Sequence, residues 1–222
     1  MKIINASYEI VNKDKINGIE ILKDIEAVGR TCYKSEANIT DDSAKKFVAM
    51  LIDRGHEAMI EHNAISVRFI CDRGVSHELV RHRLASFGQE STRYCNYSKN
   101  KFGNELTFIK PIFNKYNCDA GMYDTFEDTC RFIEKRYFEM LKHGATPQEA
   151  RSILPNSLKT EIVMTMNLRE WRHFFKLRCD KAAHPQTREI ANMILKEFKE
   201  KIPVIFDDLY ESFVGGINEK AE

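Results

Sequence analysis

The sequence predicts a single α/β domain over residues 1–222, with few, long strands flanked by helices. Apolar residues recur at helical spacing in several segments, two longer segments are typical of strands, and no repeat or interdomain linker interrupts the chain. A fold of this length buries roughly 70% of its unfolded surface, so a core is not limiting.

The N-terminal part predicts two amphipathic helices, at residues 19–33 and 41–54. Thr40 or Asp41 is expected as the N-cap of the second helix, and Gly55 follows its end.

Residues 64–71 predict a strand, because they are β-branched and aromatic with partial alternation. Residues 75–83 fit a short helix. A further strand is expected at residues 106–109, before Pro111.

Four elements are expected in the C-terminal half. A long helix is predicted at residues 119–143, and Thr146-Pro147-Gln148-Glu149 marks the start of another helix that runs to Leu154. A strand at residues 160–166 leads to Asn167, which can cap a helix at residues 168–177. A last amphipathic helix is expected at residues 187–201, before an apolar tail.

Composition narrows the class of protein. The apolar fraction is 43% and the charged fraction 30%, values that favour neither disorder nor a membrane protein. The first residues form no signal peptide, so the expected location is the cytoplasm, and the six dispersed cysteines are expected to be reduced thiols. A net charge of +1 argues against a dedicated nucleic-acid binder.

The densest polar segment is residues 81–94, which read RHRLASFGQESTRY. Guanidinium groups grip phosphate oxygens, while Gln and Glu can read a base edge, so this set suits a phosphate-bearing ligand. If residues 75–83 are helical, Glu78, Arg81 and His82 share one face and Arg83 points away. Composition alone favours a different interpretation, a solvated basic helix end, where Arg and His interact well with the helix macrodipole.

The spacing Arg81-His82-Arg83, seven residues, then Ser91 resembles the motif of flavin-dependent thymidylate synthases. Ser86 and Arg93 also stand at matching positions. The resemblance covers about residues 56–184, through GHE at 55–57, AR at 150–151, NLR at 167–169 and LR at 177–178.

The resemblance implies reductive methylation of dUMP to dTMP. Methylenetetrahydrofolate would donate the carbon, and FAD reduced by NADPH would donate the hydride. It further implies a mainly antiparallel sheet and a homotetramer whose active sites are shared between subunits. Neither nucleic acid nor membrane is an expected partner.

The resemblance also implies a role for each matching residue. The expected FAD contacts are His56, Arg81, His82, Arg83, Asn167, Arg169 and His173. The expected dUMP contacts are Glu78, Arg81, Gln89, Glu90, Ser91, Arg93, Arg151 and Arg178.

Within the dUMP set, Arg93 and Arg151 are expected on the phosphate and Arg178 on the uracil, where its charge would serve catalysis. Ser91, the second candidate catalytic residue, is expected to form a hydrogen bond. Some family members carry Asn-Glu where this chain has Gly88-Gln89, which makes Glu90 a candidate for the role of that carboxylate.

Other interpretations stay open from the residues alone. A nucleotide phosphohydrolase or transferase would need a carboxylate cluster for Mg²⁺, but Asp41-Asp42 and Asp207-Asp208 are better explained as a helix start and a solvated turn. An RNA-binding module is weakly suggested by the aromatic residues near the arginines. No metal site is expected, because the histidines of the segment 56–62 are six residues apart rather than four.

Overall fold

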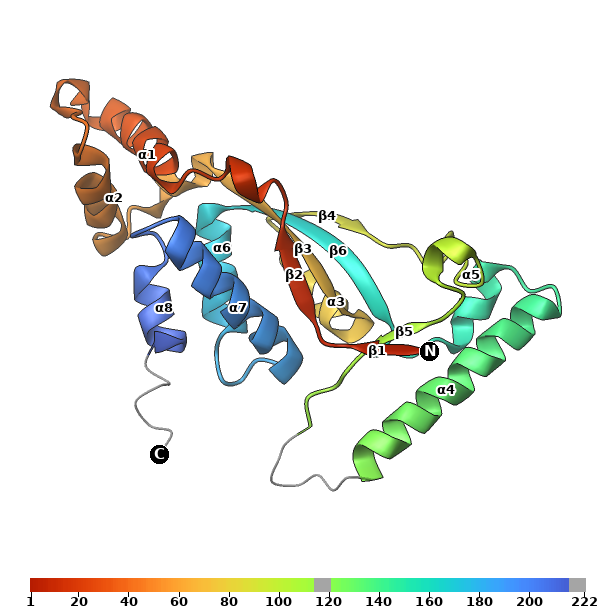
Figure 1. Ribbon diagram of the computed structural model, residues 1–222. Helices are drawn as coiled ribbons and strands as arrows, with labels where there is room; N and C mark the ends of the chain where they lie inside the picture. Colours follow the sequence, from red (N-terminus) through yellow and green to blue (C-terminus); the bar gives the residue numbers. More distant parts are fainter. Residues whose placement is uncertain (114–120, 216–222) are drawn as a thin grey trace. The chain divides into compact units, whose positions relative to one another are not determined.

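The computed structural model describes residues 1–113 and 121–215, in which helices and strands combine into an α+β fold (Figure 1). The strands are β1 (Lys2–Ile4), β2 (Ser7–Ile10), β3 (Ala64–Asp72), β4 (Ser86–Gln89), β5 (Thr107–Ile109) and β6 (Lys159–Asn167). The α-helices are α1 (Gly18–Tyr33), α2 (Ser43–Asp53), α3 (Arg73–Leu79), α4 (Gly121–Lys142), α5 (Pro147–Ala150), α6 (Leu168–Arg178), α7 (Pro185–Lys201) and α8 (Asp207–Phe213).

The larger sheet has the strand order β2-β3-β6-β4, and β1 and β5 form a separate parallel pair. Strands β3 and β6 run antiparallel. The Leu168 N–H donates to the Asn63 carbonyl, and the Ser66 and Thr165 hydroxyls lie 2.7 Å apart, so residue numbers rise on one strand as they fall on the other. The expected mainly antiparallel sheet is therefore confirmed.

The two central strands are the long ones. β3 and β6 have nine residues each, and β1, β2, β4 and β5 have three or four. Buried residues alternate along both long strands, as expected where one face of a sheet packs on a core. Their alternation made them predictable, whereas β1, β2 and β4 are too short to show a period.

The helix predicted at residues 75–83 is wrong in both boundaries. The Asp72 carboxylate accepts a hydrogen bond from the Val75 N–H at 2.7 Å, which starts α3 at Arg73, and the helix ends at Leu79. His82 is buried beyond this end, and residues 86–89 pair with the sheet as β4. Tertiary contacts thus overrode the helical pattern, and the expected shared helical face of Glu78, Arg81 and His82 does not form.

The remaining helices follow the predictions with local corrections, except α8, which forms within the segment expected to be an apolar tail. α2 begins at Ser43 after Asp42, so Thr40 and Asp41 are not its N-cap; Gly55 ends it with a left-handed φ of 69°. In the long helix, residues 121–142 are helical, and residues 119–120 of the prediction lie outside the described residues.

The helix start at Thr146 is confirmed, but the helix is shorter than predicted. The Glu149 carboxylate accepts hydrogen bonds from the Thr146 N–H and hydroxyl at 2.8 and 2.7 Å. The α-helical part ends at Ala150 and continues as a 3₁₀ turn, Arg151–Ile153. The turn ends before Leu154, whose backbone is extended because Pro155 follows it.

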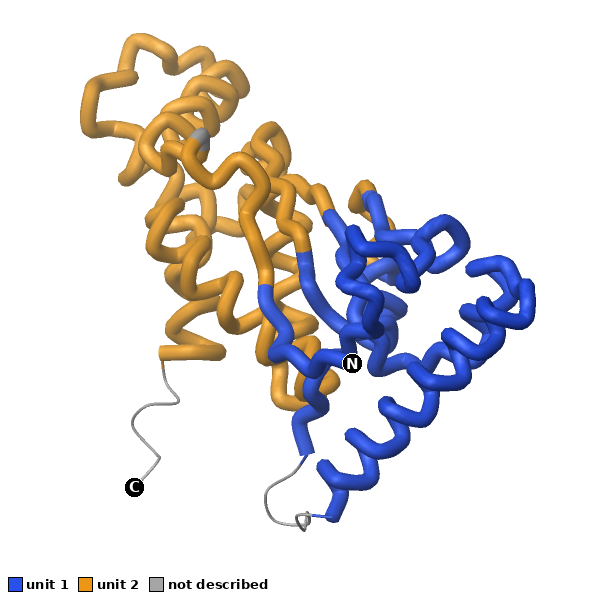
Figure 2. The backbone as a smooth tube through the Cα atoms, turned by 45° about the vertical axis from the view of Figure 1, so that its right-hand side comes forward, with its two compact units in different colours: residues 1–7, 69–81, 87–163 blue, residues 8–68, 82–86, 164–222 orange. Residues whose placement is uncertain are grey.

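Two compact units divide the chain, each made of discontinuous segments (Figure 2). Unit 1 comprises residues 1–7, 69–81 and 87–163, and unit 2 comprises residues 8–68, 82–86 and 164–222. The expectation of a single domain over the whole chain stays a prediction.

Each unit has its own core. In unit 1, Leu106, Phe108 and Leu158 pack with Tyr97 and Tyr137. In unit 2, Trp171 is fully buried among aromatic rings of α6 and α7, and its indole N–H donates to the Ile65 carbonyl at 3.0 Å. Trp171, Phe174 and Phe175 were expected to be core, and they are. No helix in the described residues is both long and apolar enough to cross a membrane.

A buried arginine ties three segments of unit 2 together. Arg172 is 3% exposed; it donates to Glu57 at 2.9 Å and forms two hydrogen bonds of 2.7 Å with Asp208. Asp208 is thus an ion-pair partner, and its interpretation as part of a solvated turn is wrong. Arg172 serves the fold, because its guanidinium is held by protein carboxylates.

We expect Arg172→Ala to lower the free energy of unfolding by about 3–5 kcal/mol, because it strands two carboxylates beside a buried site. Equilibrium urea unfolding measures the change. Arg131→Ala is the matched control: Arg131 is 61% exposed and paired with Glu127, and its loss should cost below about 0.5 kcal/mol. Equal effects of the two variants would contradict the structural role of Arg172.

Candidate active site

The residues predicted to contact FAD and those predicted to contact dUMP belong mostly to different units. His56, His82, Arg83, Asn167, Arg169 and His173, expected on FAD, all belong to unit 2. The expected dUMP contacts belong to unit 1, except Arg178, which is in unit 2. Arg81, expected on both ligands, is an exposed residue of unit 1.

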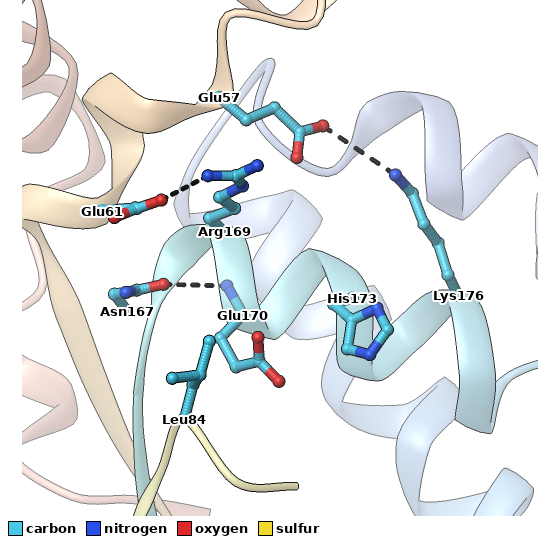
Figure 3. A pocket seen from close by; sticks show the side chains of 8 residues that line it. All are labelled: Glu57, Glu61, Leu84, Asn167, Arg169, Glu170, His173 and Lys176. Atoms are coloured by element: carbon cyan, nitrogen blue, oxygen red, sulfur yellow. Dashed lines mark hydrogen bonds and ion pairs between the residues drawn. The ribbon is translucent and has the colours of Figure 1, made fainter.

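A pocket of about 730 Å³ lies along α6, from its N-cap Asn167 to Lys176 in the third turn (Figure 3). Asn167 positions this helix by accepting a hydrogen bond from the Glu170 N–H at 2.8 Å. Arg169, His173 and Lys176 follow at i, i+4 and i+7, so they share one face. The pocket is lined by Glu57, Glu61, Leu84, Asn167, Arg169, Glu170, His173 and Lys176.

Positive and negative side chains alternate around this pocket. Arg169 pairs with Glu61 at 2.5 Å, and Lys176 lies 3.9 Å from Glu57 (Figure 3). Burial raises the pKa of the Glu170 carboxyl above its usual range.

The size and the polar side chains of the pocket fit a flavin dinucleotide, whose pyrophosphate would compete with Glu61 and Glu57 for Arg169 and Lys176. Arg169 and Lys176 are cations for a pyrophosphate, and Asn167 and His173 offer hydrogen bonds to a ring system. The volume lies in the usual range of cofactor pockets, about 300–1,000 Å³. Three of the predicted FAD contacts therefore lie together in one pocket.

His82 lies beside this region as a buried, neutral side chain. Its ring is 4% exposed, packs 5.1 Å from the Phe174 ring, and accepts a hydrogen bond at Nε2 from Arg178 Nε at 3.0 Å. Burial lowers the pKa of His82 to about 4, and the nearby charges of Arg178 and His173 add to the effect. Nδ1 therefore carries the proton at neutral pH, and Nε2 orients the Arg178 guanidinium.

Gln89 and Glu90, adjacent in sequence, have no partner in common. The Gln89 amide donates to the Ser76 and Thr160 hydroxyls at 3.0 and 3.2 Å. The Glu90 carboxylate accepts from the Tyr97 hydroxyl at 2.9 Å and from Lys159 at 3.1 Å. Each side chain thus has its own set of contacts in unit 1.

Arg93 and Arg151 are brought together from distant parts of the sequence. Arg93 Nε donates to Gln148 of α5 at 3.1 Å, and Arg151 donates to the hydroxyl of Thr92, the neighbour of Arg93, at 3.4 Å. Both guanidinium groups are exposed, and Ser91 lies two residues before Arg93, whose N–H donates to the Ser91 hydroxyl at 3.3 Å. Two cations and a hydroxyl in one place suit a phosphate monoester.

Sequence reasoning missed five residues that line the α6 pocket: Glu57, Glu61, Leu84, Glu170 and Lys176. Lys176 had a signal, because it continues the helical spacing of Arg169 and His173. Leu84 and Glu170 had none that separates them from surface residues. Of the other predicted contacts, Glu78 is half-buried, and Arg83 and His56 are exposed.

Comparison with known proteins supports the family expected from the sequence motif. Residues 19–204 match the family of the thymidylate synthase complementing protein. The flavin-dependent thymidylate synthase of Pyrococcus abyssi is 36% identical over 169 residues, which is 76% of this chain and 68% of that protein. Its counterpart from Corynebacterium aurimucosum is 31% identical over 204 residues, 84% of this chain and 79% of that protein.

A solved structure resembles the whole chain. It is the UMP/dUMP methylase PolB from Streptomyces cacaoi bound with 5-Br dUMP, which superposes with a TM-score of 0.75 at 20% identity and covers 96% of this chain and 98% of that one. The likeness shows that the chain shares the α+β fold of that structure. From the extent of the family match, the chain belongs to the thymidylate synthase complementing protein family, and the expected family is confirmed.

We expect the buried His82 to make stability depend on pH. Its pKa is near 4 in the folded state and about 6.5 when unfolded, so the unfolded state binds the proton first. Stability is therefore lost as the pH falls from about 6.5 through 4, by about 3 kcal/mol in total.

Urea unfolding at pH 7 and pH 4 measures this loss in the wild type and in His82→Phe, which cannot titrate. The variant should lack the additional loss, whereas His77→Phe, a change at an exposed residue of α3, should keep it. The same pH dependence in all three proteins would contradict a buried neutral His82.

Proposed function

We propose that the chain is a flavin-dependent thymidylate synthase that converts dUMP to dTMP in the cytoplasm, with methylenetetrahydrofolate as carbon donor and NADPH as reductant. The observation that carries the proposal is the junction of Arg93 and Arg151 beside Ser91, in a chain of this family. Relatives named for this reaction support it.

In the proposed complex, Arg93 and Arg151 bind the dUMP phosphate. Both are exposed and held by neutral partners, Gln148 and Thr92, so their charge is available to an anion. Forked guanidinium groups bind phosphate in two places at once, which also fixes the orientation of the nucleotide. Glu78, Arg81, Gln89 and Glu90 are proposed to complete the nucleotide site.

The α6 pocket is proposed to hold FAD, with Arg169 on the pyrophosphate and Asn167 and His173 hydrogen-bonded to the cofactor. His56, Arg81, His82 and Arg83 are the further proposed contacts. When bound and reduced by NADPH, the flavin would supply the hydride that completes the new methyl group. The protein's part is to bind both ligands, to exclude water and to place charge.

Arg178 is the proposed catalytic residue, acting on the uracil. Negative charge on the carbonyl oxygens of the base would accompany the activation of C5 as a nucleophile toward the methylene carbon, and a guanidinium aimed there stabilises it. His82 holds Arg178 Nε at 3.0 Å. Because His82 stays neutral, it orients the guanidinium without adding a competing positive charge.

Ser91 is proposed as a hydrogen-bonding residue rather than a nucleophile. Its hydroxyl accepts from the Arg93 N–H, and no hydrogen bond to a general base is among its contacts in the described residues. Cys95, the thiol nearest the motif, is half-buried, and burial raises its pKa, which disfavours the reactive thiolate.

The proposed assembly is a homotetramer with shared active sites. β4 is an edge strand whose four residues are exposed, and Val80, Leu84, Phe87 and Tyr94 expose large apolar side chains around it in sequence. Exposed apolar side chains on an unpaired edge favour burial against another chain. Size-exclusion chromatography with light scattering tests this; an active monomer is incompatible with shared sites.

We expect Arg178→Ala to lower kcat for dTMP formation by about 10²–10³, the usual cost of removing an oxyanion-stabilising donor. Anaerobic assays with FAD, NADPH and methylenetetrahydrofolate measure dTMP directly. Arg188→Ala is the control: the side-chain hydrogen bond of Arg188 in the described residues goes to the Lys181 carbonyl, and the variant is expected to retain full activity. Wild-type turnover by Arg178→Ala would remove the charge-stabilising role.

We expect Ser91→Ala to retain turnover, with kcat/KM lowered about 2- to 15-fold, because one hydrogen bond contributes about 0.5–1.5 kcal/mol. A nucleophilic serine would instead lose nearly all activity on this substitution. Mass spectrometry of the enzyme quenched during turnover provides the second readout, since no adduct on the peptide carrying Ser91 is expected.

A further inference from the structure

A second pocket in unit 2 carries basic side chains without acidic ones. It has a volume of about 490 Å³ and lies where α1 packs on α2. Arg30, Lys46, Arg54 and His56 line it, and in the part of the chain that the structure describes no Asp or Glu does. This distinguishes it from the α6 pocket, where carboxylates balance the cations.

The acidic partner of Arg30 is Glu26, whose carboxylate is already hydrogen-bonded within the protein. Glu26 is 1% exposed and accepts hydrogen bonds from Arg30 Nε and Nη2 at 3.1 and 2.9 Å and from the Ser43 hydroxyl at 2.7 Å. Lys46 and Arg54 form no ion pair with any residue in the described ranges. Like charges gathered without counter-charge repel one another, so the pocket favours an anionic ligand.

The pocket also offers an apolar surface. Phe47 and Met50 of α2 line it together with Tyr33, which is 65% exposed. The Arg30 guanidinium lies 4.4 Å from the centroid of the Phe47 ring. A ligand that combines an aromatic ring with negative charge would use both surfaces.

The spacing of the cations favours an extended anion over a compact one. Lys46 and Arg54 are eight residues apart on α2 and its C-cap, which corresponds to about 12 Å along the axis. A single phosphate contacts both only if the two long side chains bend toward each other. A chain of carboxylates could contact Lys46 and Arg54 at once without either side chain bending toward the other.

This pocket and the proposed flavin pocket are lined by consecutive residues of the chain. His56 lines the cationic pocket and Glu57, the next residue, lines the α6 pocket, so their Cα atoms are about 3.8 Å apart. A ligand that reacts at the flavin therefore has the cationic pocket within reach of its tail. The folate donor has such a tail, an aromatic p-aminobenzoyl group followed by γ-linked glutamates.

We propose that the cationic pocket between α1 and α2 binds the p-aminobenzoyl-polyglutamate tail of the folate donor, an inference that rests on the proposed function. The aromatic group would contact Phe47, Met50 and Tyr33. Lys46 and Arg54 would bind successive glutamate carboxylates.

Direct binding tests the pocket without the reaction. The probe is end-labelled p-aminobenzoyl-pentaglutamate, followed by fluorescence anisotropy with the full chain. We expect the double variant Lys46→Glu/Arg54→Glu to weaken binding about tenfold, the sum of two exposed ion pairs. The control Lys45→Glu, on the same helix but outside the pocket, should change the Kd less than twofold.

Equal probe binding by the wild type and the double variant overturns the proposal, as does the absence of probe binding to the wild type. Displacement of the probe by NADP⁺ at a concentration equal to that of unlabelled probe also overturns it, since the pocket would then be a nucleotide phosphate site.

Kinetics test the inference on the reaction. We expect the KM of pentaglutamyl methylenetetrahydrofolate to be about 5- to 10-fold below that of the monoglutamyl form, and the double variant to lose this difference with unchanged kcat and FAD content. A KM independent of tail length in an active enzyme overturns the inference alone. Failure to form dTMP from the monoglutamyl form overturns the proposed function, and the anisotropy result still decides the pocket.

Discussion

The antiparallel pairing of β3 and β6 is the interaction on which the rest of the structure depends. Each of these strands ends at a residue whose side chain caps the next helix: Asp72 accepts from the Val75 N–H, and Asn167 accepts from the Glu170 N–H. The pairing therefore fixes where α3 and α6 begin. α3 leads directly to the arginine-histidine segment, and α6 carries Arg169, His173 and Arg178.

Charge is handled differently in the core and at the candidate sites. Arg172 is buried and forms ion pairs with Glu57 and Asp208, so its charge is neutralised within the protein. Arg93 and Arg151 are exposed and bonded to neutral groups, which keeps their charge for a ligand. Composition does not separate these classes, since a guanidinium becomes structural or functional according to its partners.

His82 is buried in the core and also contacts the proposed catalytic residue, Arg178. Its burial keeps it neutral, and neutrality lets it accept a hydrogen bond from Arg178 instead of repelling it. A lysine or a charged histidine at this place would turn the guanidinium away. The apolar contact with Phe174 is thus part of how the proposed catalytic arginine is oriented.

The sequence by itself determined the family, the two long alternating strands and the caps at Thr146 and Asn167, because these depend on spacing, period and short-range hydrogen bonds. Only the tertiary structure decided that α3 stops at Leu79, that Arg172 is an ion-pair partner in the core, and that Arg93 and Arg151 share one place. It also decided the contacts of Gln89 and Glu90, which differ although the residues are neighbours. Such features depend on which distant segments meet, and local pattern carries no information about partners that lie many residues away.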